Sequence, residues 1–420
     1  MMVNKMAAEN QLNCTDNQAG LEIVTGGVTV PQGFLAAAAG AEIRYKDRPD
    51  LALLYSVVPA TAAALYTQNK VQAAPVVVTR EHLRDGRAQA VVINSGIANA
   101  GTGPQGLEDA RHMAQLVARN LQLRTEDVAV ASTGVIGTLL PMERVETGIN
   151  IAAASLSAEG GTEAARAIMT TDTRLKEIAV KVDLGGHWIT IGGMAKGSGM
   201  IHPNMATMLA FLTTDAEIDA GFLHQSLTAA AQRSFNMITV DGDTSTNDMV
   251  IMLANGQAKN PRISGTGKES VIFQKALDWV TQYLAKELAR DGEGATRLIE
   301  VRIRQAASLI DAQKAGRAVA GSSLVKSAVF GRDANWGRIL AAAGYSGAEF
   351  DPQQTSVWLG EVLVAQKGTA VSFDEDRARQ VLDEETVVIT VDLGAGEVGA
   401  VAWGCDLTFD YIKINASYRS

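Results

Sequence analysis

The chain has 420 residues, of which 47% are hydrophobic and 20% charged, and its net charge is −9. This composition is typical of a globular protein of two or three domains and excludes a mainly disordered chain. Because the balance is acidic and no long run of Lys and Arg occurs, we expect no nucleic-acid partner. The two cysteines, Cys14 and Cys405, are too few for a disulfide framework or a four-cysteine zinc site, which favours a reducing compartment.

Nothing in the sequence predicts a membrane segment or a secretion signal. The N-terminal residues 1–20 are polar and lack a basic stretch followed by an apolar core. The most apolar candidate, residues 34–41, is too short and alanine-rich to span a bilayer. We therefore expect a soluble cytoplasmic protein. The 40 glycines and the aromatic content of 5% favour a sheet-rich enzyme over a helical bundle.

In chain order, the first part mixes apolar runs, which predict strands, with apolar stripes at helical spacing, which predict helices. The predicted strands cover residues 51–58, 75–79, 88–94 and 127–132, and the predicted helices cover residues 107–121, 141–156, 221–234 and 269–290. Residues 178–184 and 188–192 alternate apolar and polar positions about Gly185-Gly186, which predicts a β-hairpin.

After Thr296, apolar and polar residues alternate, which predicts strands. We expect one helix over residues 308–319 and strands over 356–365, 386–392 and 399–409. We therefore predict a polar N-terminal segment over residues 1–20, a larger α/β domain over 21–296 and a smaller C-terminal α/β domain over 297–420. Because strands and helices do not alternate regularly, stacked mixed β-sheets flanked by helices are favoured over a doubly wound sheet.

Several familiar catalytic and metal-binding motifs are incomplete. The Gly267-Lys268 pair suggests a phosphate loop, but Arg262 stands where its first glycine is needed. The acidic run that begins at Asp241 lacks the glycine and the glutamate of a calcium loop. The five histidines show no HExxH spacing, and no GxSxG elbow occurs, so neither a zinc hydrolase nor a serine hydrolase is predicted.

The strongest chemical signal is the glycine-rich segment over residues 192–210. An irregular loop leads to Thr207, and the chain then becomes apolar and strand-like. If the Ala206–Thr207 peptide bond breaks, Thr207 gains a free α-amine that can act as general base for its own hydroxyl, as in N-terminal-nucleophile enzymes. For this segment taken alone, a glycine-rich loop that is not cleaved remains the alternative.

Further motifs occur in order along nearly the whole chain. They are Asn94-Ser95-Gly96 with Ala98-Asn99-Ala100, residues 132–137 (Ser-Thr-Gly-Val-Ile-Gly), 169–173 (Met-Thr-Thr-Asp-Thr), 196–209, 241–248, 330–339, 402–408 and 414–420. With these motifs the chain resembles the ornithine acetyltransferase family, also called glutamate N-acetyltransferase, of arginine biosynthesis. Two positions depart from the family pattern: Ile97 stands where asparagine is usual, and Gly101 where cysteine is usual.

The resemblance implies an αββα arrangement and cleavage between Ala206 and Thr207 into an α chain (1–206) and a β chain (207–420), which assemble as heterotetramers of two α and two β chains. It implies that Thr207 takes the acetyl group of N2-acetyl-L-ornithine and passes it to L-glutamate by a ping-pong mechanism through an acetyl-threonine intermediate. The family includes members that also accept acetyl-CoA, and the sequence leaves open whether this chain does so. The mechanism uses no metal and no bound cofactor.

The resemblance also implies the site residues. Thr133 and Gly134 match the family's oxyanion donors, and the substrate-binding residues are Thr170, Lys196, Thr207, Glu293, Asn415 and Ser420. On charge alone, we expect Lys196 to bind a substrate carboxylate and Glu293 to bind the ammonium group of ornithine.

Two rival functions remain open at this stage. A self-processing aminopeptidase or amidase of similar architecture would resolve the acyl-enzyme with water instead of glutamate. A non-enzymatic protein that binds a small ligand would keep the pocket but leave the chain uncleaved.

Overall fold

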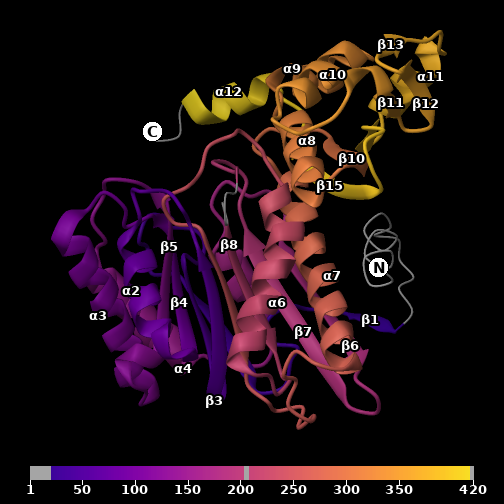
Figure 1. The fold of residues 1–420 in the computed structure, drawn as a ribbon. Coiled ribbons are helices and arrows are strands. Elements are labelled where there is room, and N and C mark those ends of the chain that lie inside the picture. The colour runs from indigo at the N-terminus through magenta and orange to yellow at the C-terminus, as the bar shows by residue number, and fades with distance from the viewer. Residues whose placement is uncertain (1–19, 203–207, 417–420) are drawn as a thin grey trace.

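The computed structural model describes residues 20–202 and 208–416, which form two mixed β-sheets with helices packed against them (Figure 1). The larger sheet has the strand order β1-β6-β7-β8-β9-β3-β4-β5, and β2 pairs with β3. Its strands are β1 (Leu21–Val24), β2 (Phe34–Ala39), β3 (Leu51–Tyr66), β4 (Arg87–Ile97), β5 (Val128–Val135), β6 (Lys176–Asp183), β7 (Trp188–Lys196), β8 (Leu209–Thr214) and β9 (Met249–Ala254). The predicted hairpin is confirmed, because β6 and β7 pair antiparallel.

Alternating side chains along the strands build three apolar layers. On β4, Val91 and Ile93 point into a central layer that also holds Phe211 of β8 and Ile251 of β9. This central layer lies between the two halves of the larger sheet. The intervening β4 residues Ala90 and Val92 point to the other face of the sheet, where they are buried in a separate apolar layer. The central layer therefore has one half of the larger sheet on each side, and helices cover the outer face of each half. This is the stacked arrangement predicted from the sequence.

Helices cover the two outer faces of the larger sheet (Figure 1). One outer layer packs α2 (Ala74–His82) against β5, α3 (Gly103–Leu121) against β4 and β5, and α4 (Met142–Ala154) against β2 and β3. The other packs α6 (Ala220–Arg233) against β3 and α7 (Lys268–Arg290) against β6 and β7. The short helix α5 (Gly161–Ala167) contacts β2 and β3.

The smaller sheet has the order β13-β12-β11-β14-β10-β15 and follows α7 in the chain. Its strands are β10 (Leu298–Ala306), β11 (Ser356–Leu359), β12 (Val362–Gln366), β13 (Thr369–Ala370), β14 (Thr386–Asp392) and β15 (Val398–Cys405). Its helices are α8 (Leu309–Gly321), α9 (Ser323–Gly331), α10 (Trp336–Gly344), α11 (Glu375–Leu382) and α12 (Phe409–Ala416). Division into separate domains at residue 297 stays a prediction, and the predicted N-terminal segment lies outside the described residues except for Gly20.

Three predicted strands need correction. Residues 75–79 lie in helix α2, because Pro75 occupies the first helical turn, where its missing N–H costs nothing, and the β-branched Val76 and Val78 are both fully buried. The strand expected over residues 356–365 is a hairpin that turns at Gly360, whose φ of +55° favours glycine. The strand expected over residues 399–409 ends at Cys405, and α12 begins at Phe409.

No helix within residues 20–202 and 208–416 is long and apolar enough to cross a membrane.

Candidate active site

A cavity of about 530 Å³ opens where β5, β7 and β8 meet the segment before β9 and the loop after α7. Every predicted site residue that the structure describes lines it: Thr133, Gly134, Thr170, Lys196, Glu293 and Asn415. Ala206, Thr207 and Ser420 lie outside the described residues. Met208, which follows Thr207 in the chain, lines the same cavity. The structure therefore brings together residues that are up to 282 positions apart, from Thr133 to Asn415 (415 − 133).

The backbone at the end of β5 requires glycine. Gly134 has a φ of +134°, and a Cβ atom placed there would lie 2.2 Å from the carbonyl carbon of Gly96 on the neighbouring strand β4. No side chain fits such a contact, and the left-handed backbone would be strained for any other residue. The close approach of β4 and β5 thus fixes the position of the Thr133 side chain and of the Gly134 N–H group beside the cavity.

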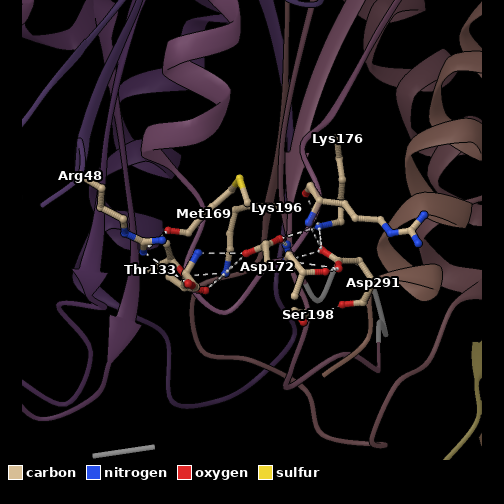
Figure 2. Close-up of polar contacts among 12 residues, drawn as sticks. Arg48, Thr133, Met169, Asp172, Lys176, Lys196, Ser198 and Asp291 are labelled. Atoms are coloured by element: carbon tan, nitrogen blue, oxygen red, sulfur yellow. Dashed lines mark hydrogen bonds and ion pairs between the residues drawn. The ribbon is translucent and has the colours of Figure 1, made fainter. Parts of the chain in front are cut away.

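Lys196, the last residue of β7, connects both predicted threonines. Its Nζ atom donates to Thr170 Oγ1 at 2.8 Å and to Thr133 Oγ1 at 3.2 Å (Figure 2). A hydroxyl that accepts from an ammonium group keeps its own hydrogen free to donate elsewhere. Burial lowers the pKa of Lys196, because the charged form loses hydration, and the nearby Asp172 charge opposes that shift.

Lys196 is also part of a buried network of ion pairs. Asp172 lies 4.0 Å from Lys196 Nζ and 2.7 Å from Lys176 Nζ, and it accepts a hydrogen bond from Gly197 N–H at 2.7 Å (Figure 2). Lys176 also contacts Asp291 at 2.5 Å. Burial alone would raise the pKa of Asp172, but the charges of Lys176 and Lys196 outweigh it and hold the pKa below its usual range.

The cavity lining also includes a carboxylate that the C-terminal helix holds. Glu293 is 6% exposed, and its Oε2 atom accepts a hydrogen bond from Asn415 Nδ2 of α12 at 2.8 Å. The Glu293 N–H donates to Ser198 O at 3.0 Å, which ties this loop to the glycine-rich segment. A Cβ atom at Gly199 would lie 2.4 Å from the Glu293 carboxylate, so glycine leaves the room that this side chain needs.

The comparisons with known proteins agree on one family. The chain matches the ArgJ family model over residues 35–420. It is 60% identical over 402 residues to the arginine biosynthesis bifunctional protein ArgJ of Symbiobacterium thermophilum, which covers 95% of this chain and 100% of the relative. The chain belongs to the ArgJ family. The protein of the same name from Caldanaerobacter subterraneus subsp. tengcongensis is 52% identical over 404 residues, with 95% of this chain and 100% of the relative covered.

Among solved structures, the ornithine acetyltransferase of Mycobacterium tuberculosis complexed with ornithine is 42% identical, covers 44% of this chain and 100% of that chain, and has a TM-score of 0.41. The assignment to the ArgJ family rests on the family model and the full-length relatives. It confirms the family predicted from the motifs.

Three features of this ArgJ pocket were not singled out from the sequence. Asp172 and Asp248 lie inside the motifs quoted above, but nothing in their spacing indicated a role. Lys176 occupies an alternating strand, where a lysine normally predicts a solvent-facing position, yet its side chain has no exposure. Contacts with Asp172 and Asp291 compensate this buried charge, and the second joins residues 115 positions apart.

Proposed function

We propose that this chain transfers the acetyl group of N2-acetyl-L-ornithine to L-glutamate through an acetyl-Thr207 intermediate, after cleavage between Ala206 and Thr207. The observation that carries the proposal is that the same cavity is lined by Thr133, Gly134, Lys196, Glu293 and Met208. Its volume of about 530 Å³ suits an acylated amino acid. The name of the ArgJ relatives, arginine biosynthesis bifunctional protein, supports the same assignment.

In the first half-reaction, Thr207 Oγ attacks the acetyl carbonyl carbon and its α-amine takes the hydroxyl proton. The developing oxyanion accepts hydrogen bonds from the Thr133 hydroxyl and the Gly134 N–H. Lys196 supports this role, because its ammonium group donates to Thr133 Oγ1 and leaves the hydroxyl hydrogen free for the oxyanion. The amide C–N bond then breaks as the leaving nitrogen takes the hydroxyl proton from the α-amine, and one further proton gives ornithine in its ammonium form.

The charges of the cavity match the two ends of the substrate. A lysine ammonium has three donors, and Lys196 uses two of them on Thr170 and Thr133, so one remains for a substrate carboxylate. Glu293 uses its Oε2 atom on Asn415, which leaves Oε1 for the side-chain ammonium of ornithine.

The proposal extends to assembly, location and the second activity. The α and β chains form a cytoplasmic heterotetramer of two copies each, and the reaction needs neither a metal nor a bound cofactor. Acetyl-CoA is the proposed second acetyl donor, which would account for a bifunctional enzyme. Incubation of the purified protein with acetyl-CoA and glutamate tests this point, and a failure to form N-acetylglutamate would make the enzyme monofunctional.

Intact mass spectrometry tests the main proposal. The protein is measured alone and after brief exposure to N-acetylornithine, and we expect two chains, of which the one beginning at Thr207 gains one acetyl group. A single uncleaved chain without an adduct would refute the mechanism and favour a binding protein. Acetate release without glutamate, at a rate that glutamate does not change, would favour the amidase alternative.

A further inference from the structure

The cavity contains a second carboxyl group that the mechanism above does not use. Asp248 lines the cavity together with Glu293, yet it is only 2% exposed. Its Oδ2 atom is buried and has no hydrogen-bond partner among the described residues. A buried carboxyl oxygen without a partner is costly, so a native site that retains one calls for a ligand or a functional reason.

The sheet places Asp248 beside the nucleophile's end of β8. Asp248 directly precedes β9, which runs parallel to β8, and the Met249 N–H donates to Met208 O at 3.0 Å. Met208 is the residue that follows Thr207 in the sequence. Across β8, Lys196 is paired with Leu209, which in turn is paired with Met249. Asp248 and Lys196 therefore flank the start of β8 from its two neighbouring strands.

Few groups compensate the Asp248 carboxyl. The charged group that acts on it is Lys196, and the hydroxyl groups of Ser245 and Thr67 lie close. Burial raises the pKa of Asp248 well above its ordinary value, and these three groups offset that shift only in part. A carboxyl group in this state keeps its proton to a higher pH than an exposed one and releases it more readily when a cation enters the cavity.

The proposed reaction requires such a proton carrier, because its two amino groups change protonation in opposite directions. Ornithine leaves as an amine that must gain a proton, whereas glutamate arrives as an ammonium that must lose one before its nitrogen can attack. One oxygen of Glu293 accepts a hydrogen bond from Asn415. Asp172 is paired with Lys176 and accepts a hydrogen bond from the Gly197 N–H. Among the described residues that line the cavity, Asp248 is the acidic residue whose carboxyl oxygen Oδ2 has no hydrogen-bond partner. It precedes Met249, which is hydrogen-bonded to Met208, the residue after Thr207.

We propose that Asp248 contacts the α-nitrogen of the substrate and carries the proton between the two half-reactions. This inference rests on the proposed function. With ornithine, the departing nitrogen takes the Thr207 hydroxyl proton from the α-amine and a second proton from the Asp248 carboxylic acid, and the resulting carboxylate binds the new ammonium. With glutamate, the carboxylate takes one proton from the α-ammonium. The nitrogen then bonds to the acetyl carbon, the bond from that carbon to Thr207 Oγ breaks, and Oγ takes the second nitrogen proton.

The test compares Asp248→Asn with the wild type in acetyl transfer to glutamate over a range of pH. Asparagine keeps the shape but cannot carry a proton, so we expect the turnover number to fall by about 100-fold or more. In the wild type, acetyl transfer from the preformed acetyl-enzyme to glutamate rises with pH as Asp248 ionises, whereas acetylation by N-acetylornithine falls, and the variant loses both trends. Hydroxylamine, which is largely uncharged at neutral pH, should remove the acetyl group from the preformed acetyl-enzyme of the variant at a rate much closer to that of the wild type.

A second readout does not depend on turnover or self-cleavage. Ornithine binding is measured by calorimetry in buffers of different ionisation enthalpy, which reports the protons released. We expect the wild type to release about one proton more per site than Asp248→Asn, because the incoming ammonium ionises Asp248. The matched control is Asp243→Asn, which makes the same change at an exposed carboxylate five positions earlier and should behave as the wild type.

The two kinds of failure are distinguishable. If the wild type transfers acetyl from N-acetylornithine to glutamate while Asp248→Asn keeps the wild-type turnover, pH profile and proton release, the role of Asp248 is refuted and the proposed function stands. If the wild type itself does not transfer acetyl, the proposed function fails first.

Discussion

At the residue scale, Asp172 illustrates how a buried charge ties the active site to stability. Its side chain has no exposure and lies between the ammonium groups of Lys176 and Lys196. Removing one partner of a buried ion pair leaves an uncompensated charge, so we expect Asp172→Asn to lower the free energy of unfolding by about 3–5 kcal/mol at pH 7. Urea unfolding curves of the variant and the wild type measure this loss.

The pH dependence of that loss has a defined sign. The pKa of Asp172 is lower in the folded chain than the value of about 3.9 expected in the unfolded chain, so its contribution is complete above this value and is lost as pH falls below it. The difference between Asp172→Asn and the wild type should therefore be constant above about pH 4 and shrink as pH falls below that value. The control is Glu163→Gln, which removes an exposed pair with Arg166 and should change stability by no more than about 1 kcal/mol. A difference that stays constant with pH would contradict the assigned ion network.

At the element scale, the end of strand β5 depends on the contact between two backbones. We expect Gly134→Ala to force β5 away from β4, because the new methyl group would lie 2.2 Å from the Gly96 carbonyl carbon. This shift would displace a predicted oxyanion donor, and loss of one such donor costs about 100-fold to 1,000-fold in turnover. Gly137→Ala is the matched control: its φ of +83° is also left-handed, but no atom lies within 4 Å of the added methyl group. Steady-state kinetics should show near wild-type turnover for Gly137→Ala, and equal losses in both variants would contradict the role of the β4–β5 contact.

The C-terminal helix α12 allows a separate test of Ser420. None of the α12 residues is buried, and the helix is held by Asn415 on Glu293 and by Thr408 Oγ1, just before it, on Gly294 O at 2.7 Å. Deletion of residues 417–420 leaves both contacts in place. We expect the deletion to raise KM or abolish activity without lowering the melting temperature, because it removes the predicted ligand Ser420. Unchanged kinetics would show that Ser420 does not bind substrate.

At the scale of the whole molecule, the sequence predicted local features better than long-range ones. The apolar stripe of α7 and the hairpin at Gly185-Gly186 are local patterns, and both predictions are confirmed. The valine run in α2 predicted a strand because tertiary packing is invisible in a local pattern. The burial of Lys176 could not be predicted, since it depends on a contact with a residue 115 positions away. The predicted site residues came from motifs of a known family, and the structure places the described ones around one cavity.

The strand order makes a prediction about the two chains after cleavage. Strands β8 and β9 follow residue 207, yet they lie between β7 and β3, which precede it. β8 pairs with β7 over six residue pairs, and β9 pairs with β3 over six more. Separation of the α and β chains would therefore break two internal ladders and expose four strand edges.

We expect the cleaved protein to elute as one species in native size-exclusion chromatography and its two chains to separate only in denaturant. The β chain produced alone, as residues 207–420, should aggregate, because both outer edges of its β8–β9 pair lack their partners. Elution of two independent chains in native buffer would contradict this strand order. Interleaving of the strands would thus hold the cavity together after the proposed cleavage between residues 206 and 207.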